Sequence, residues 1–238
     1  MADKYHVIVV GSGGTGTYFL KEFCRFIAGG HYLVNKLTII DGDTVEAKNL
    51  DRQAFSEEDI GLSKSAVMAD VLTSAFDLNR VESYSEYLTE LDQLEVIANT
   101  SSIPLIVGCV DNHACRMLLE EYFNKHSDCV YLDSANEFST GEVIFSYKKG
   151  GKVISPCRSH YYPEIVKSAK KVTEMSCEEL NSVSPQHIAT NMQAGNILLK
   201  EVTAILSGTP HPGMVTFDLD MYYQEFWPYE EKAEGSAA

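Results

Sequence analysis

The sequence predicts an α/β protein with a Rossmann-like, doubly wound sheet, whose parallel N-terminal half is continued by antiparallel C-terminal strands. Apolar runs alternate with helical segments over the first 133 residues, which is typical of a parallel sheet covered by helices. A glycine-rich turn follows the first apolar run, at residues 11–16. After residue 140 the pattern changes to the polar and apolar alternation of antiparallel strands.

Each element of the parallel half is predicted from its own residues. Helices are expected from the glycine turn to about residue 28, where Gly29-Gly30 ends the first of them, and from Ser63, a suitable N-cap, to about residue 76. Further helices are expected at 90–98 and 112–125. Strands are expected at residues 5–10, 37–41, 81–84, 105–110 and 129–133. Crossovers between such strands are right-handed.

The C-terminal part is predicted to be less regular. Residues 141–147 alternate like an antiparallel strand, whereas 149–183 show no clear period and are expected to form an irregular crossover segment. A long apolar helix at 185–206 and a hairpin at 214–219 and 221–227 follow. No repeat or linker divides the chain, so residues 1–229 are expected to form a single domain, followed by a disordered polar tail at 230–238.

Composition narrows the class of protein. The 238 residues are 45% hydrophobic and carry a formal charge of −15, which disfavours binding to nucleic-acid phosphates and to anionic membranes. No apolar run approaches the ~20 residues that cross a bilayer, and a strand begins too early to leave room for a signal peptide. The six cysteines do not suggest a disulfide framework. A cytoplasmic protein is expected.

The glycine turn predicts a nucleotide site. Gly11, Gly13 and Gly16 match G-x-G-x-x-G between a strand and a helix. Together with Gly14, these residues allow the backbone to approach a phosphate at the N-terminus of the helix. Asp41 ends the second strand, where an acid commonly binds ribose hydroxyls. Because NAD and ATP both carry ribose, Asp41 does not discriminate between them.

A polar set after the second strand does discriminate. Asn49, Arg52 and Gln53 are spaced to project from one short turn, and Lys64 begins the next helix. An NAD site needs no cationic cluster there, whereas the γ-phosphate and the leaving pyrophosphate of a nucleoside triphosphate do. Asp111 follows the fourth strand at the carboxyl edge of the sheet, where it could hold Mg²⁺ on the phosphates.

In this order, the motifs resemble those of the ThiF/MoeB/ubiquitin-activating-enzyme superfamily of adenylyltransferases. The resemblance covers most of residues 5–220, and the compact size is similar to that of the PRTRC-type ThiF proteins, from bacterial gene systems that also encode a small ubiquitin-like protein. The matching pieces are Gly-Ser-Gly-Gly-Thr-Gly at 11–16, Asp41-x-Asp43-x-Val45, Asn49-Leu-Asp-Arg52-Gln53, Gly61-x-x-Lys64 and Asp111-Asn112-x-x-x-Arg116.

The resemblance implies an enzyme that binds ATP and Mg²⁺ and adenylates the C-terminal carboxylate of a small ubiquitin-like protein, releasing pyrophosphate. It implies a homodimer, because relatives usually pair. By similarity, Asp41 would hold the ribose and Asp111 the Mg²⁺. The remaining nucleotide-site residues would be Asp43, Asn49, Arg52, Gln53, Lys64 and Asn112, with the phosphates held by Asn49, Arg52, Gln53 and Lys64.

Two features depart from the family pattern. Many members bind zinc through two Cys-x-x-Cys pairs, but here Cys157 and His160 stand in place of the first pair, and no cysteine follows Cys177. Cys157, His160 and two of Cys177, His187 or His211 could supply the four ligands of a structural zinc, but loss of the zinc site is expected. Cys177 lies near where members carry a cysteine that takes the activated carboxylate as a thioester. The flanking Glu178 and Glu179 should raise the pKa of that thiol, which leaves both a catalytic and an inert reading open.

Three alternative functions remain open. The same fold could adenylate a different carboxylate, on a small molecule or an RNA, although the acidic balance argues against RNA. An NAD-dependent oxidoreductase would explain the glycine turn and Asp41 but not Arg52 or Lys64. A noncatalytic scaffold would be expected to lose the Arg, Lys and Asp set, which this sequence keeps.

Overall fold

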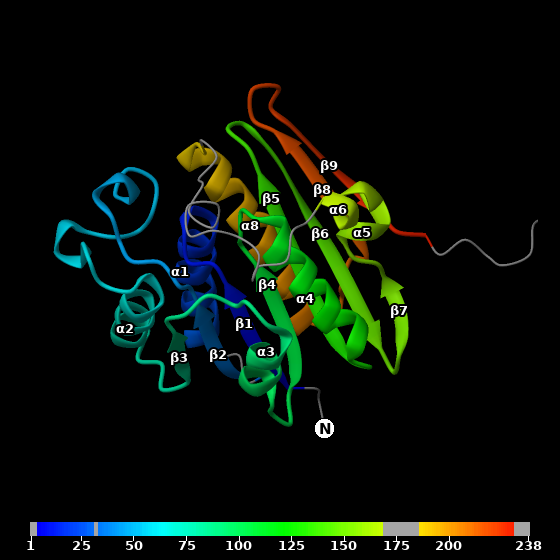
Figure 1. Cartoon of the computed structure of the whole chain (residues 1–238), viewed down its shortest axis with the longest axis horizontal. Helices are drawn as coiled ribbons and strands as arrows, with labels where there is room; N and C mark the ends of the chain where they lie inside the picture. The colour runs from blue at the N-terminus through cyan, green and yellow to red at the C-terminus, as the bar shows by residue number, and fades with distance from the viewer. Residues whose placement is uncertain (1–3, 31–32, 169–185, 231–238) are drawn as a thin grey trace, which may run out of the picture.

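The computed structural model describes residues 4–30, 33–168 and 186–230, which form a mixed nine-stranded sheet covered by helices on both faces (Figure 1). The strand order is β3-β2-β1-β4-β5-β6-β8-β9, with β7 paired to β6. The sheet is parallel from β3 to β5 and antiparallel from β5 to β9. The predicted Rossmann-like fold with its antiparallel continuation is confirmed.

The elements of the parallel half match the sequence pattern closely. Its strands are β1 Tyr5–Val10, β2 Val34–Ile40, β3 Val81–Tyr84, β4 Ile103–Gly108 and β5 Cys129–Asn136. Its helices are α1 Gly14–Ala28, α2 Lys64–Phe76, α3 Leu91–Ala98 and α4 His113–Lys125, with short 3-10 turns η1 Ala47–Asn49 and η2 Glu57–Asp59. Ser63 caps α2 as predicted, because its hydroxyl accepts a hydrogen bond from the Ala66 amide.

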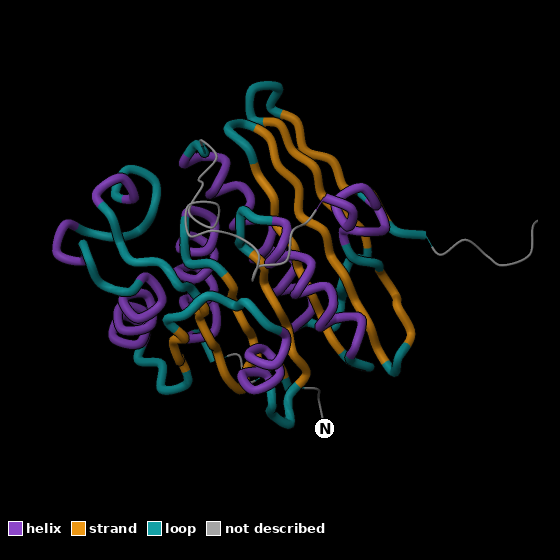
Figure 2. The backbone as a smooth tube through the Cα atoms, viewed as in Figure 1, coloured by secondary structure: helices purple, strands orange, loops and turns teal. Residues whose placement is uncertain are grey.

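The C-terminal elements include some that the sequence pattern did not predict. They are β6 Thr140–Lys149, β7 Lys152–Ser155, α5 Arg158–Tyr161, α6 Pro163–Ser168, α8 Ile188–Leu206, β8 Gly213–Asp218 and β9 Tyr223–Pro228. Figure 2 shows β5, β6, β8 and β9 as neighbouring strands. Irregular structure was expected over 149–183, but the described part of this segment contains β7, α5 and α6. These elements are too short to show a period in the sequence.

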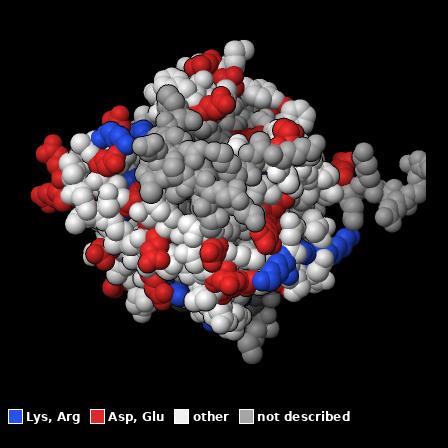
Figure 3. All heavy atoms as spheres, viewed as in Figure 1, with Lys and Arg blue, Asp and Glu red and all other residues white. Residues whose placement is uncertain are grey.

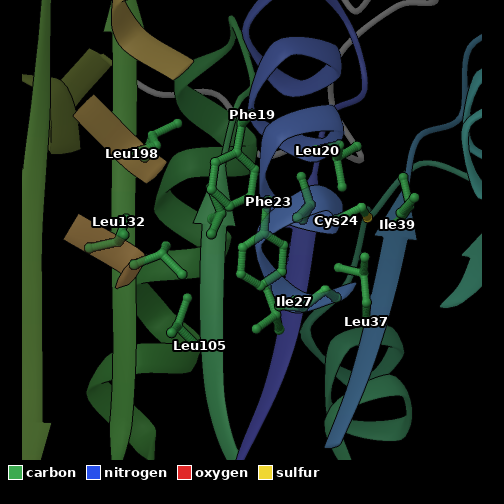
Figure 4. Packing of buried hydrophobic residues seen from close by; sticks show 14 of the residues in the cluster. Phe19, Leu20, Phe23, Cys24, Ile27, Leu37, Ile39, Leu105, Leu132 and Leu198 are labelled. Carbon is green, nitrogen blue, oxygen red and sulfur yellow. The ribbon is translucent and has the colours of Figure 1, made fainter. Parts of the chain in front are cut away.

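The core lies on both faces of the parallel strands. Alternate residues of β1 point to opposite sides, so that Val7 and Val9 join one buried cluster and Ile8 and Val10 the other. Phe19, Phe23 and Ile27 of α1 pack on one face of the sheet (Figure 4). Burial on both faces explains why these strands read as continuous apolar runs rather than alternating ones.

The described surface agrees with the composition. On the face drawn in Figure 3, acidic side chains are spread widely and basic ones gather in few places. Within the described residues, no helix is long and apolar enough to cross a membrane. The five cysteines of the described ranges are all free thiols.

His6 makes the stability of the fold sensitive to acid. Its ring is fully buried on β1 beside Thr38, and burial, helped by the charge of Lys36, lowers its pKa from 6.5 to about 4. Since the folded pKa is depressed, the stability from neutral His6 is present above pH 6.5 and is lost as the pH falls toward 4. The cost at low pH is about 3 kcal/mol.

We therefore expect His6→Gln, which keeps a polar partner for Thr38, to lose less stability than the parent between pH 7 and pH 4. Urea unfolding at a series of pH values measures this. His160→Gln, at an exposed histidine, is the matched control and should leave the profile unchanged. Parallel profiles for the parent and His6→Gln would contradict the assignment.

Candidate active site

The carboxyl ends of the parallel strands open into a cavity of about 830 Å³. Almost all the nucleotide-site residues predicted from the sequence line it. They are Gly11, Gly13, Gly14, Asp41, Asp43, Asn49, Arg52, Gln53, Lys64, Asp111 and Asn112. Ligands of open α/β sheets bind at this edge. The structure therefore brings together residues that lie up to 101 positions apart, from Gly11 to Asn112.

The glycine turn is built for close approach of backbone segments. Gly11 has a φ of +92°, and a Cβ there would lie 2.5 Å from the carbonyl oxygen of Cys109. A Cβ on Gly16 would lie 2.0 Å from the carbonyl oxygen of Gly11, so Gly16 seats α1 against the turn and does not line the cavity. No side chain caps α1, which leaves its first amides for an anion.

Asp41 is held in place by donors of the surrounding loops. Its Oδ2 accepts hydrogen bonds from the amide and the hydroxyl of Ser12, at 2.7 and 2.8 Å, and its Oδ1 accepts from the Asp43 amide at 2.9 Å. Burial raises the pKa of Asp41, against the opposing effect of nearby Lys64. Asp41 thus joins the glycine turn to the loop after β2, with free lone pairs at the cavity.

Lys64 is a buried cation at the start of α2. Its Nζ lies 2.9 Å from Oδ2 of Asp43, and its side chain is only 7% exposed. The Tyr87 hydroxyl donates to the other oxygen of Asp43. The ring of Tyr87 covers Gly42 so closely that a Cβ on that glycine would lie 2.5 Å from it. No sequence signal marked Tyr87, which lines the cavity from a loop.

The turn after β2 carries one residue that shapes the turn and others whose polar groups are available to a ligand. Asn49 is buried, and its Oδ1 accepts a hydrogen bond from the Glu46 amide at 2.9 Å, so its side chain shapes the turn. Arg52 donates to Oε1 of Gln186 at 3.3 Å, and within the described residues it has no acidic partner. Gln53 is buried, and its Oε1 has no partner there. Arg52 therefore keeps donors for an anion in the cavity.

Asp111 and Asp43 supply carboxylates to the same cavity. Desolvation by the surrounding protein raises the pKa of Asp111. The charge of Asp43 adds to this effect, and the charges of Arg116 and Lys64 oppose it. Asn112 caps α4, since its Oδ1 accepts from the Cys115 amide at 2.8 Å. No group of three His, Cys, Asp or Glu that could hold a metal occurs in the described ranges. Mg²⁺ commonly uses one or two carboxylates together with substrate phosphates, which fits this pair.

A buried ion network, which sequence reasoning missed, supports the far wall of the cavity. Asp133 is fully buried on β5 and binds Arg116 through Oδ1 at 3.1 Å and Arg158 through Oδ2. Arg158 also pairs with Glu142, which accepts from the Tyr162 hydroxyl. Glu142 and Tyr162 line the cavity.

Arg116, the last residue of the Asp111 motif, acts within this network as a clamp. It donates to the carbonyl oxygen of Val110 and, at 2.9 Å, to that of Ser134. These bonds tie the end of β5 to the loop that carries Asp111. The guanidinium of Arg116 therefore holds β5 and the Asp111 loop together, and its donors are used by these protein groups rather than left for a ligand.

The sequence profile of the ThiF family matches residues 2–234. The chain belongs to the ThiF family.

Relatives of this ThiF-family chain have related names. Adenylyltransferase and sulfurtransferase UBA4 of Lodderomyces elongisporus is 26% identical over 204 residues, covering 85% of this chain and 40% of that protein. Ubiquitin-like modifier-activating enzyme 5 of Drosophila willistoni is 32% identical over 130 residues, covering 51% and 30%. The chain thus spans less than half the length of these curated relatives.

A solved structure confirms the fold of this ThiF-family chain. E. coli MccB, solved with ATP, matches with a TM-score of 0.70 and 15% identity, covering 97% of this chain and 65% of that one. At this identity, the match establishes only that the two chains share a fold.

The residues weighed for a zinc site are engaged elsewhere where the structure describes them. Cys157 is buried in the apolar cluster beneath α4, and burial raises the pKa of its thiol. The His160 ring contacts Tyr161 and Tyr229. His211 binds Glu201 at 2.9 Å, and His187 caps α8. Cys177, the predicted acceptor thiol, lies outside the described residues.

Proposed function

We propose that this chain uses ATP to adenylate the C-terminal carboxylate of a small ubiquitin-like protein, with release of pyrophosphate. The observation that carries the proposal is that Arg52, Lys64 and Asp111 line one cavity beside the uncapped N-terminus of α1. The names of the relatives, an adenylyltransferase and a ubiquitin-like modifier-activating enzyme, support this substrate class.

Each residue has a role in the proposed mechanism. The first amides of α1 and the cations Arg52 and Lys64 bind and orient the phosphates and offset charge as pyrophosphate leaves. Asp41 orients the ribose. Asp43 and Asp111 would hold Mg²⁺, which supplies further charge neutralisation on the phosphates when bound. The proposed role of the residues that line the cavity is to orient the carboxylate toward the α-phosphorus, since positioning of this kind supplies much of the rate of phosphoryl chemistry.

The context of the reaction is also proposed. We infer a homodimeric, cytoplasmic enzyme of the PRTRC-type subgroup, because relatives usually pair and the chain is compact and acidic. We also infer that the zinc site of other family members is lost in this chain, since the described candidate ligands have other partners.

Pyrophosphate exchange into ATP tests the proposed function. Exchange should depend on Mg²⁺ and on a ubiquitin-like protein encoded next to this chain, and deletion of that protein's last residues should abolish it. Tight NADH binding without ATP binding would instead favour an oxidoreductase. Exchange driven equally by small carboxylic acids would keep adenylation but reject the protein substrate.

The proposed role of Cys177 has its own test. Cys177→Ala should leave pyrophosphate exchange within about twofold and should abolish a reducible thioester to the ubiquitin-like protein, because the thiol acts only after adenylation. Non-reducing electrophoresis after incubation with ATP measures the thioester. Cys24→Ala, at a buried thiol whose pKa burial raises to about 12, is the control. A thioester that survives Cys177→Ala would show that another residue is the acceptor.

A further inference from the structure

The side-chain amide of Asn136 is fixed between the glycine turn and the antiparallel half of the sheet. Asn136 ends β5 and lines the cavity. Its Nδ2 donates to Oδ1 of Asn191 at 2.8 Å, and its Oδ1 accepts from the Thr15 hydroxyl at 3.2 Å. Thr15 belongs to the first turn of α1. The amide is thus tied to the helix N-terminus that faces the cavity.

Asn191 keeps that amide in place at a cost to stability. It lies on α8 and is fully buried, and its Nδ2 has no hydrogen-bond partner within the described residues. It approaches Gly14 so closely that a Cβ on that glycine would lie 2.0 Å from the Asn191 amide nitrogen. An unpaired buried donor costs about 1–3 kcal/mol. A buried polar pair that carries such a cost calls for an explanation other than packing.

The cavity differs chemically on the two sides of Asn136. Arg52 and Lys64 line it on the β2 side, whereas Glu137 and Glu142 line it toward β6. Glu142 is compensated by its ion pair with Arg158 and by the Tyr162 hydroxyl, so within the described residues this wall offers no uncommitted cation to a triphosphate. Gly141 is crowded there, because a Cβ would lie 2.4 Å from the Phe217 ring. The β6 side therefore presents the neutral amide of Asn136 beside a wall without uncommitted cations in the described residues, where a single carboxylate needs less charge compensation than a triphosphate.

We propose that Asn136 is a catalytic residue that binds the acyl-donor carboxylate beside the α-phosphate, and that Asn191 is the positioning residue that holds its amide. The inference rests on the proposed adenylation. One N–H of Asn136 is used by Asn191, and the other has no acceptor within the described residues. A neutral amide orients a carboxylate without forming the ion pair by which a lysine would weaken it as a nucleophile.

The step balances without a further reactant. The second N–H of Asn136 binds one carboxylate oxygen, and the other oxygen forms a bond to the α-phosphorus. The bond from that phosphorus to the oxygen bridging toward the β-phosphate breaks, and its electron pair leaves with pyrophosphate. The carboxylate is already ionised at neutral pH, so no proton is transferred.

Binding of two probes tests the inference. The first is AMP, and the second is the acyl-adenylate mimic 5′-O-(N-acetylglycyl)sulfamoyl adenosine. Both are titrated by calorimetry into the full chain. Asn136→Ala should weaken binding of the mimic about tenfold and change AMP binding by less than about twofold. Asn124→Ala, at an exposed asparagine of α4, is the matched control. If Asn136→Ala lowers the melting temperature strongly, Asn136→Ser serves the same comparison.

Asn191 is tested by rescue. Asn191→Asp keeps the oxygen that accepts from Asn136, so it should keep the preference for the mimic over AMP. Asn191→Leu removes the acceptor and should lose that preference. A merely structural role would make both variants weaken both probes alike.

The remaining outcomes separate this inference from the proposed function. If the parent chain binds neither probe, both fail. If the parent prefers the mimic and Asn136→Ala weakens mimic and AMP equally, or neither, adenylation stands and the role of Asn136 is overturned.

Discussion

Arg52→Ala should lower the rate of pyrophosphate exchange by at least about 10²-fold, because removal of one preorganised donor from a developing anion typically costs 10²–10³ in rate. Arg52 lines the cavity, and its guanidinium has only Gln186 as a side-chain partner within the described residues. Its charge is therefore available to the phosphates. Melting temperature should change little, since no ion pair within the described ranges is lost.

The comparison needs two further variants. Arg52→Lys keeps the charge but not the planar fork, so it should recover only part of the rate. Arg25→Ala removes an arginine that is 63% exposed on α1 and paired with Glu22, and it should leave exchange unchanged. Exchange by Arg52→Ala within threefold of the parent would show that Arg52 is a surface charge, and the proposed phosphate site would lose its main support.

The second large effect is expected on stability. Arg158→Met should lower the free energy of unfolding by about 3–5 kcal/mol, because it leaves a buried carboxylate with an incomplete partner set. Arg158 is 4% exposed and binds both Asp133 and Glu142. Asp133 would keep Arg116 alone, and Glu142 would keep the Tyr162 hydroxyl. Urea unfolding at neutral pH measures the loss.

Arg25→Met provides the exposed counterpart and should cost less than about 1 kcal/mol. A loss below 1 kcal/mol for Arg158→Met would indicate that the ion network contributes little more to the free energy of unfolding than a methionine packed in its place. Because Glu142 and Tyr162 line the cavity, Arg158→Met should also weaken binding of the acyl-adenylate mimic more than that of AMP. That second readout separates a loosened far wall from global unfolding.

Much of the parallel half of the fold could be predicted, because the sequence signals for its turns and helix starts are local. Gly11 of the first turn has positive φ, which glycine adopts readily, and Gly16 lies too close to the Gly11 carbonyl oxygen to carry a Cβ. The carboxyl ends of parallel strands share one edge, so Asp41 and Asp111 had to meet there. The helix after Ser63 began where an N-cap predicts it.

The rest depends on contacts that no local pattern encodes. Arg158 lies in a segment without period, and its pairing with Asp133 across 25 positions follows only from the tertiary structure that brings the two residues together. Asn136 and Asn191 meet across 55 positions because α8 packs against β5. Arg116 belongs to the Asp111 motif by sequence, but its bonds to two carbonyl oxygens depend on positions that the sequence does not state.

The outermost strand of the antiparallel half has a consequence for how this protein behaves in solution. Within the described residues nothing pairs with the outer edge of β9, and Tyr223, Phe226 and Trp227 are exposed on it. Free backbone groups beside aromatic side chains form a template on which another chain can add a strand. The charge of −15 makes copies repel one another. That repulsion opposes association through the β9 edge, and it weakens with ionic strength because salt confines it to about 8 Å under physiological conditions.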